Sequence, residues 1–168
     1  MIIRQYFKSE RETVSGGFRY WMAHWAMVNY IALKLGRWRV RYLFHDIEKP
    51  WMDMLYDHKF TKKYHVTHSR HHIEYAKAHP EIPLKDACDW QEMVLDFESA
   101  RVTKAEKPLD AYDTIRRMTE EGAYGMPETG VYLTEAYHEL GLDHIKVLPV
   151  MVSDGTHMYP ETVMFVKK

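Results

Sequence analysis

The sequence predicts a mainly α-helical protein, a bundle of about five to six helices that ends in a small C-terminal β-hairpin. Two observations predict this class. Apolar residues recur at helical spacing in segments bounded by glycine or proline, and the tail changes to two short apolar runs around a turn. A chain of 168 residues is long enough for one domain with a real core. We therefore expect a single domain over residues 1–168, with a helical core at about 18–122 and a C-terminal helix and hairpin at about 130–168.

The first helix is expected over residues 18–35, after the break "SGG" at 15–17 and before Gly36. Four residues recur at helical spacing along it: His24, Val28, Ile31 and Leu35. His24 therefore shares its stripe with apolar residues rather than with solvent.

The second helix is expected from about Trp38 to Glu48, and Pro50 should end or bend it. Its inward residues should be Val40, Leu43, Phe44 and Ile47. The stretch "YLFHDIEKP" closes this helix, so that His45 and Asp46 stand side by side at the end of an apolar run.

The third helix is expected over residues 62–79, before Pro80, and it carries a cluster of histidines. His68 and His72 are four residues apart and should face together, with His65 three residues before His68.

Three further helices are expected at about 83–104, 108–121 and 129–141. The tail segments "IKVLPVMV" and "ETVMFVKK" are predicted to form two strands, with Asp154 and Gly155 near the tip of the turn. Pro149 and Pro160 favour edge positions over a large sheet.

The composition argues against several classes of protein. The net charge of −1 gives no strong nucleic-acid signal. Cys88 is the only cysteine and allows no internal disulfide. The N-terminus lacks a signal-peptide core, and no apolar run has the length of a membrane span. We therefore expect a cytoplasmic protein without a membrane partner, and a homo-oligomer stays open.

Histidine is the residue whose frequency stands out, with eleven in the chain. Six of them lie between residues 45 and 72: His45, His58, His65, His68, His71 and His72. Clustered histidines inside a folded region suggest a metal site, although a solvated helix face can also collect them.

Carboxylates add to this cluster. Asp89, Glu92 and Asp96 fall at helical offsets and should share one face of the fourth helix. Apolar neighbours such as Trp90 and Phe97 leave little room for a purely polar face, so a positive charge should compensate the carboxylates. Helical bundles build metal sites from inward imidazole and carboxylate groups. Such mixed ligands suit Mn, Co, Ni, Fe or Zn better than calcium.

The order of His24, "HDIEK" at 45–49, the histidine cluster and Asp96 resembles the H…HD…D motif of the HD-domain superfamily of metal-dependent phosphohydrolases. The segments "HSRHHIEYAKAHP" and "EMVLDFESAR" resemble an uncharacterised HD-like branch found in bacteria and phages. The resemblance covers roughly residues 18–105. It implies an all-helical domain that hydrolyses a small phosphorylated substrate, often a nucleotide, with one divalent transition metal ion or two.

The resemblance also implies roles for single residues. It places a first ion on His24, His45, Asp46 and Asp96. It places ligands of a second ion at His68 and His72. His71 would contact the substrate phosphate or support one of the ligands. Lys49 would meet the substrate phosphate. Glu92, with Asp89 beside it, would be a ligand, a water-orienting base or a support for a ligand.

One position departs from the family pattern. Glu48, between Ile47 and Lys49, stands where the family usually has a small residue. An ion pair from this carboxylate to Lys49 would neutralise the phosphate-binding lysine.

Two other functions remain open beside hydrolysis: a non-catalytic, metal-stabilised helical binding module and an HD-type di-iron oxygenase. Trp21, Trp25, Tyr64 or Tyr75 are the rings available to stack on a base, although aromatic residues at helical spacing more often pack in a core. Cys88, expected on a helix, is interpreted as a small core residue rather than a nucleophile.

Overall fold

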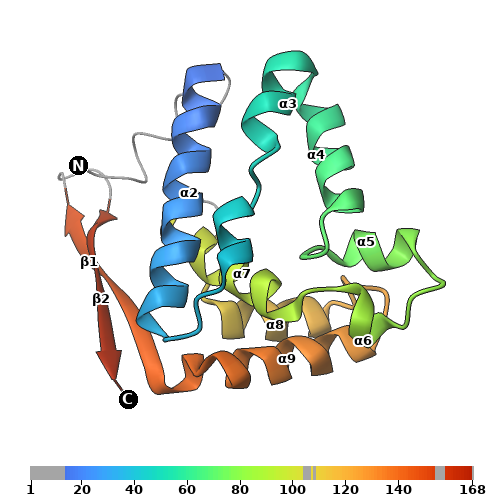
Figure 1. Cartoon of the computed structure of the whole chain (residues 1–168). Coiled ribbons are helices and arrows are strands. Elements are labelled where there is room, and N and C mark those ends of the chain that lie inside the picture. The colour runs from blue at the N-terminus through green and yellow to red at the C-terminus, as the bar shows by residue number, and fades with distance from the viewer. Residues whose placement is uncertain (1–13, 104–106, 108, 154–157, 168) are drawn as a thin grey trace.

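A computed structural model describes residues 14–103, 107, 109–153 and 158–167, and it is mainly helical, as predicted (Figure 1). The α-helices are α2 (Val14–Lys34), α3 (Lys49–Leu55), α4 (His58–His68), α5 (Ile73–Ala78), α6 (Leu84–Ala87), α7 (Trp90–Thr103), α8 (Ala111–Glu120) and α9 (Glu128–Leu140). Two short 3₁₀ helices are η1 (Val40–Phe44) and η2 (Leu142–His144). No helix in the described part of the chain has both the length and the hydropathy of a membrane span.

The core lies around α7, which packs against α2, α8 and α9. Nearly every residue of α7 is buried, including Val94 and Leu95. From α2, Val28 and Ile31 enter this core and His24 is buried with them, as the helical spacing predicts. The core helix α7 therefore carries its acidic residues into the interior of the protein.

The segment 38–48 differs from the expected helix. Only Val40–Phe44 is helical, as η1, and Pro50 lies in the first turn of α3 instead of ending a helix. Proline is well tolerated there because the first helical N–H groups have no partner within the helix. The residues expected to face inward, Val40, Leu43, Phe44 and Ile47, are exposed. A 3₁₀ helix is wound more tightly than an α-helix, and here it places Tyr42 in the core instead.

The expected helix over 62–79 is broken in two. α4 ends at His68, and α5 begins at Ile73 after an extended residue, His72. The carbonyl of Arg70 accepts a hydrogen bond from the backbone N–H of Asp89 at 2.8 Å, which is a tertiary contact and not a helical one. Because of this break, His68 and His72 do not share a helix face.

The expected helix over 83–104 is also divided, into α6 and α7. Asp89 lies at the break, and its carboxylate accepts a hydrogen bond from the backbone N–H of Glu92 at 3.0 Å. An aspartate in this position satisfies a free N–H at a helix start. The last two helices match their predicted ranges: Asp110 caps α8, and Gly141 ends α9 with a left-handed φ of 78°.

At the C-terminal end, β1 (Ile145–Ser153) and β2 (Met158–Lys167) pair antiparallel, with Ile145 opposite Lys167. The register shifts between Val150 and Met151. The predicted turn at Asp154 and Gly155 lies outside the described residues. The assignment of the whole chain to one domain stays a prediction.

Candidate metal centre

Four segments that lie far apart in the sequence bring histidines and carboxylates together in the structure. The contributing residues are His24 from α2, His45, Asp46 and Glu48 between η1 and α3, His65 from α4, His71 and His72 from the α4–α5 turn, and Glu92 and Asp96 from α7. Apart from His72 and Glu48, which are partly buried, all of them are buried. Among the described residues, this is where the candidate ligand groups gather.

Asp46 is the centre of the cluster. It is the one non-glycine residue with a positive φ (56°) in the described part of the chain, a conformation that aspartate tolerates better than most residues. Its Oδ2 lies 3.6 Å from His45 Nε2, and its Oδ1 lies 3.1 Å from the Nε2 atoms of both His65 and His71. The two oxygens of one carboxylate therefore face two different groups of ligands.

The first ligand group consists of His24, His45, Asp46 and Asp96, the four residues that the resemblance names. His24 Nε2 lies 2.7 Å from Asp96 Oδ1 and 3.4 Å from His45 Nε2. Ligand atoms of His24, His45 and Asp46 lie within 4.8 Å of one another. This spacing allows one ion to contact all of them.

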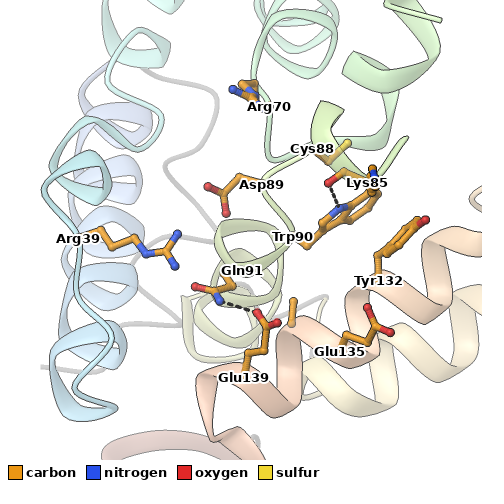
Figure 2. A pocket seen from close by; sticks show the side chains of 11 residues that line it. Arg39, Arg70, Lys85, Cys88, Asp89, Trp90, Gln91, Tyr132, Glu135 and Glu139 are labelled. Atoms are coloured by element: carbon orange, nitrogen blue, oxygen red, sulfur yellow. Dashed lines mark hydrogen bonds between the residues drawn. The ribbon is translucent and has the colours of Figure 1, made fainter. Parts of the chain in front are cut away.

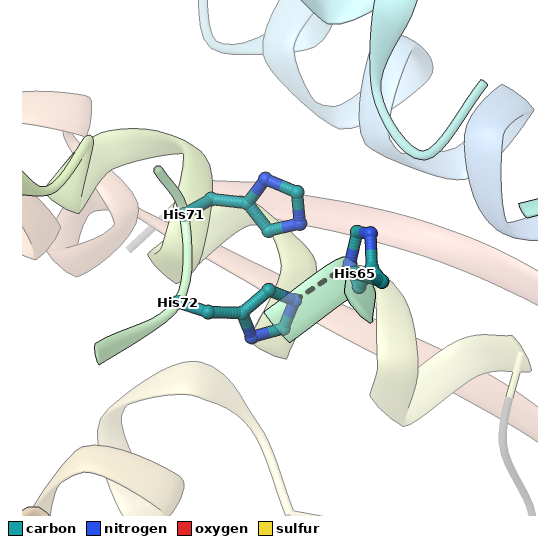
Figure 3. Close-up of side chains that lie close together, drawn as sticks. All are labelled: His65, His71 and His72. Carbon is teal, nitrogen blue, oxygen red and sulfur yellow. Dashed lines mark hydrogen bonds between the residues drawn. The ribbon is translucent and has the colours of Figure 1, made fainter. Parts of the chain in front are cut away.

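The second ligand group consists of Asp46, His65, His71 and His72, and Figure 3 shows its three histidines. The Nε2 atoms of His65 and His72 are 2.8 Å apart, and the ring of His71 lies beside both. The sequence prediction names His72 as a ligand of this group and gives His71 to substrate phosphate or to the support of a ligand, whereas His65 occupies the place expected for His68.

His68 lies outside the cluster. Its ring is exposed, stacks on Tyr64 with centroids 4.0 Å apart, and its Nδ1 lies 2.9 Å from the Tyr64 carbonyl. The break after α4 explains this position, because a continuous helix would have carried His68 and His72 on the same side.

The far ring nitrogens are held by acceptors that orient the imidazoles. Glu92 Oε1 lies 2.9 Å from His45 Nδ1 and 3.4 Å from His71 Nδ1, so one carboxylate serves both ligand groups. His24 Nδ1 lies 3.0 Å from Ser99 Oγ and 3.2 Å from Thr103 Oγ1. Both hydroxyls donate their own protons to backbone carbonyls, so they accept from His24 Nδ1–H. Each Nε2 lone pair is then free to bind a cation.

Glu48 supports His65 in the same way. Its Oε1 accepts a hydrogen bond from His65 Nδ1, and Ser69 Oγ lies 3.0 Å from the same nitrogen. The ion pair between Glu48 and Lys49, suggested by the sequence, is not what the structure contains. Lys49 Nζ lies 2.5 Å from Asp46 Oδ2 instead.

Arg41 fixes the carboxylates behind the cluster. Its guanidinium contacts Glu92 Oε2 at 3.1 Å from both Nε and Nη2, and it pairs with Asp89. Asp89 therefore faces Arg41 and caps α7, and it has no contact with the ligand groups among the described interactions. Of the three acidic residues expected on one face, only Glu92 and Asp96 point into the cluster.

The electrostatics prepare the ligands for a cation. Burial lowers the pKa of His24, of His65 and, most strongly, of His72, which favours neutral imidazole. Burial by itself raises the pKa of a carboxyl group, but His45 and Lys49 outweigh it and hold the pKa of Asp46 well below its usual range.

The pKa of Asp96 is likewise held well below its usual range, because its contact with His24 outweighs burial. The pKa of His45 is raised, since Asp46 and the hydrogen bond to Glu92 outweigh the opposite effect of burial. Ionised carboxylates thus stand beside His24, His65 and His72, whose lowered pKa favours the neutral imidazole that metal binding needs, whereas His45 would release a proton when an ion binds.

The chemistry of the donor set fits a divalent metal. Asp46 Oδ1 and His71 Nε2 are buried without a hydrogen-bond partner, although they face each other. Buried polar atoms are costly unless something satisfies them, and a cation between these atoms would do so. Imidazole and carboxylate ligands suit transition metals such as Mn, Fe, Co, Ni or Zn.

A hollow of about 360 Å³ lies beside the N-terminal end of α7 (Figure 2). Arg39, Lys85 and Glu135 line its walls, with Trp90 stacked on Tyr132. None of the ligand residues lines it. This hollow is therefore separate from the candidate metal centre.

No protein-family model, curated protein or solved structure matches this chain.

Proposed function

We propose that the protein is an HD-type, metal-dependent phosphohydrolase that acts on a nucleotide or another small phosphate ester. The observation that carries the proposal is the pair of ligand groups that share Asp46, because each group offers several imidazole and carboxylate atoms to one ion. Ligands that project from α2, α4 and α7 support an HD-like helical bundle around one ion or two.

A bound divalent ion would supply the central chemistry, by lowering the pKa of a water molecule and polarising a phosphoryl oxygen. The chain itself supplies the orientation of the ligands. Glu92 accepts a hydrogen bond from His45 and lies 3.4 Å from His71 Nδ1, so its proposed role is to position these rings rather than to touch the substrate.

Lys49 is the residue proposed to bind substrate phosphate. Its side chain is partly exposed, whereas the carboxylate of its partner Asp46 is buried. A cation at the edge of a buried acidic group can contact a phosphate oxygen from the solvent side. Because Glu48 pairs with His65, it leaves this lysine available to the substrate.

The test is release of inorganic phosphate from a panel of nucleotides and phosphate monoesters by metal-loaded protein. We expect release by the wild type and by His58→Ala, whose ring is exposed, and none by His45→Ala. A metal-loaded wild type that releases phosphate from no substrate would contradict the proposal. A visible absorption band of bound iron would then favour the oxygenase, and metal-dependent melting without turnover would favour the binding module.

A further inference from the structure

We propose that the outer face of α4 binds single-stranded nucleic acid. Three aromatic rings follow one another at intervals of four residues on this face, Phe60, Tyr64 and His68, and Tyr56, just before the helix, adds a fourth ring that contacts Phe60. We call these four residues the ring ladder. α4 stands at the edge of the molecule, so this face is turned to solvent (Figure 1).

The rings of the ladder contact one another in sequence. The centroids of Tyr56 and Phe60 are 4.9 Å apart, those of Phe60 and Tyr64 6.3 Å, and those of Tyr64 and His68 4.0 Å. The last two pairs are close to parallel, at 23° and 11°. Tyr56, Phe60 and Tyr64 are nevertheless 52%, 47% and 40% exposed. Exposed aromatic rings of this kind are what single-stranded nucleic acids stack on.

Lysines accompany the ladder. Lys63 is three residues after Phe60 and so lies beside it on the helix surface, and Lys59 lies in the first turn of the same helix. Both lysines are exposed, and neither has an ion-pair partner among the described residues. Lys62 adds a third exposed cation to the helix. The net charge of −1 is a sum over the whole chain and does not report this local group of lysines. Lysines of this kind can pair with the phosphates of a nucleic-acid backbone.

The length of the ladder favours a strand over a single nucleotide. From Phe60 to His68 the helix rises by roughly 12 Å, at about 1.5 Å per residue. Successive bases in a helical strand are only about 3.4 Å apart, so the ladder is longer than one base.

The ladder lies next to the metal centre but is separate from it. Tyr64 is on the outer face of α4, and the next residue, His65, is buried among the ligands. A strand bound along α4 would therefore pass close to the centre. The binding itself does not rest on the proposed hydrolysis, because no ladder residue belongs to a ligand group.

Fluorescence anisotropy with a labelled oligo(dT) or oligo(U) of about 15 nucleotides tests the proposal on the full chain. The assay contains EDTA, so that cleavage cannot mimic release. We expect binding at about 50 mM salt that weakens as salt increases. The double variant Phe60→Ala/Tyr64→Ala should bind at least about tenfold more weakly, since each stacked base contributes about fivefold or more.

A control variant and two further measurements separate the outcomes. Tyr112→Ala removes an exposed ring on α8 and should leave binding unchanged. Absence of binding by the wild type, or equal binding by the wild type and the double variant, would overturn the proposal. The proposal would also be overturned if sedimentation showed that the wild type is a dimer and the double variant a monomer. Binding of the wild type to anionic vesicles but to no oligonucleotide would overturn it as well.

Discussion

Glu48 accepts a hydrogen bond from Nδ1 of His65, and this contact turns the opposite ring nitrogen of His65 toward Asp46, 3.1 Å away. The two residues are 17 positions apart in the sequence, because Glu48 directly precedes α3 and His65 lies in α4. A glutamate that looks like a departure from a phosphate-binding motif thus supports a ligand of the second group.

Replacing this glutamate tests its role. We expect Glu48→Ala to weaken binding of the second ion by about 10- to 100-fold, because the loss of a hydrogen-bonded support frees the ligand ring. Affinity for inorganic phosphate should not rise, since Glu48 does not neutralise Lys49. Calorimetric titration of the apoprotein with Mn²⁺ or Co²⁺ measures the first effect, and tighter phosphate binding by the variant would show that Glu48 masks Lys49 after all.

Two aspartates near α7 make a matched pair for the first ion. Asp96 contacts His24 inside the first ligand group, whereas Asp89 pairs with Arg41 outside it. Asp96→Ala should lose the first ion, about one of two equivalents of metal, and Asp89→Ala should retain both. Elemental analysis of the two purified variants measures this. Equal metal contents would contradict the assignment of Asp96 as a ligand of the first ion.

The start of α8 gives a test of the fold that is independent of metal. Asp110 accepts a hydrogen bond from the N–H of Asp113 at 2.8 Å, and Asp110→Ala should lower the free energy of unfolding by about 1 kcal/mol. The side chain of Asp113 makes only an exposed contact to Arg116. Asp113→Ala should therefore change the free energy of unfolding by less than about 0.5 kcal/mol. Urea denaturation measures both, and a larger loss in Asp113→Ala would contradict the cap.

Cys88 provides a prediction on pH. Burial raises the pKa of its thiol from 9.0 to about 11, so at pH 8 the native thiol is protonated and should react with iodoacetamide far more slowly than in urea. Between these two pKa values the unfolded chain releases the proton and the folded chain keeps it. This group therefore lowers stability as pH rises from 9 to 11. Equal alkylation rates at pH 8 in native and unfolded protein would contradict the burial.

Local patterns were enough to predict part of this structure. The helical spacing of Val28 and Ile31 placed His24 in the core, because burial on one helix depends mainly on periodicity. The predicted ranges of the last two helices agree with α8 and α9, and in the structure Asp110 caps the first of these helices and Gly141 ends the second.

The second ligand group shows what local patterns miss. Spacing along an assumed continuous helix favoured His68, but the tertiary hydrogen bond from Asp89 to the Arg70 carbonyl accompanies a break after α4. That break leaves His68 on Tyr64 and carries His71 and His72 to His65. The buried Thr61, one helical turn before His65, marks the inner face of α4 and was the available signal for choosing His65.

The central claim is that Asp46 joins two groups of metal ligands, the second of which contains His65 and not His68. Elemental analysis of untagged protein, loaded with Mn²⁺ or Co²⁺ and freed of excess ion, tests it most directly in three forms: wild type, His65→Ala and His68→Ala. We predict about two equivalents of metal in the wild type and in His68→Ala, and about one in His65→Ala. Equal metal contents in the two variants, or a wild type that binds no metal, would contradict the account.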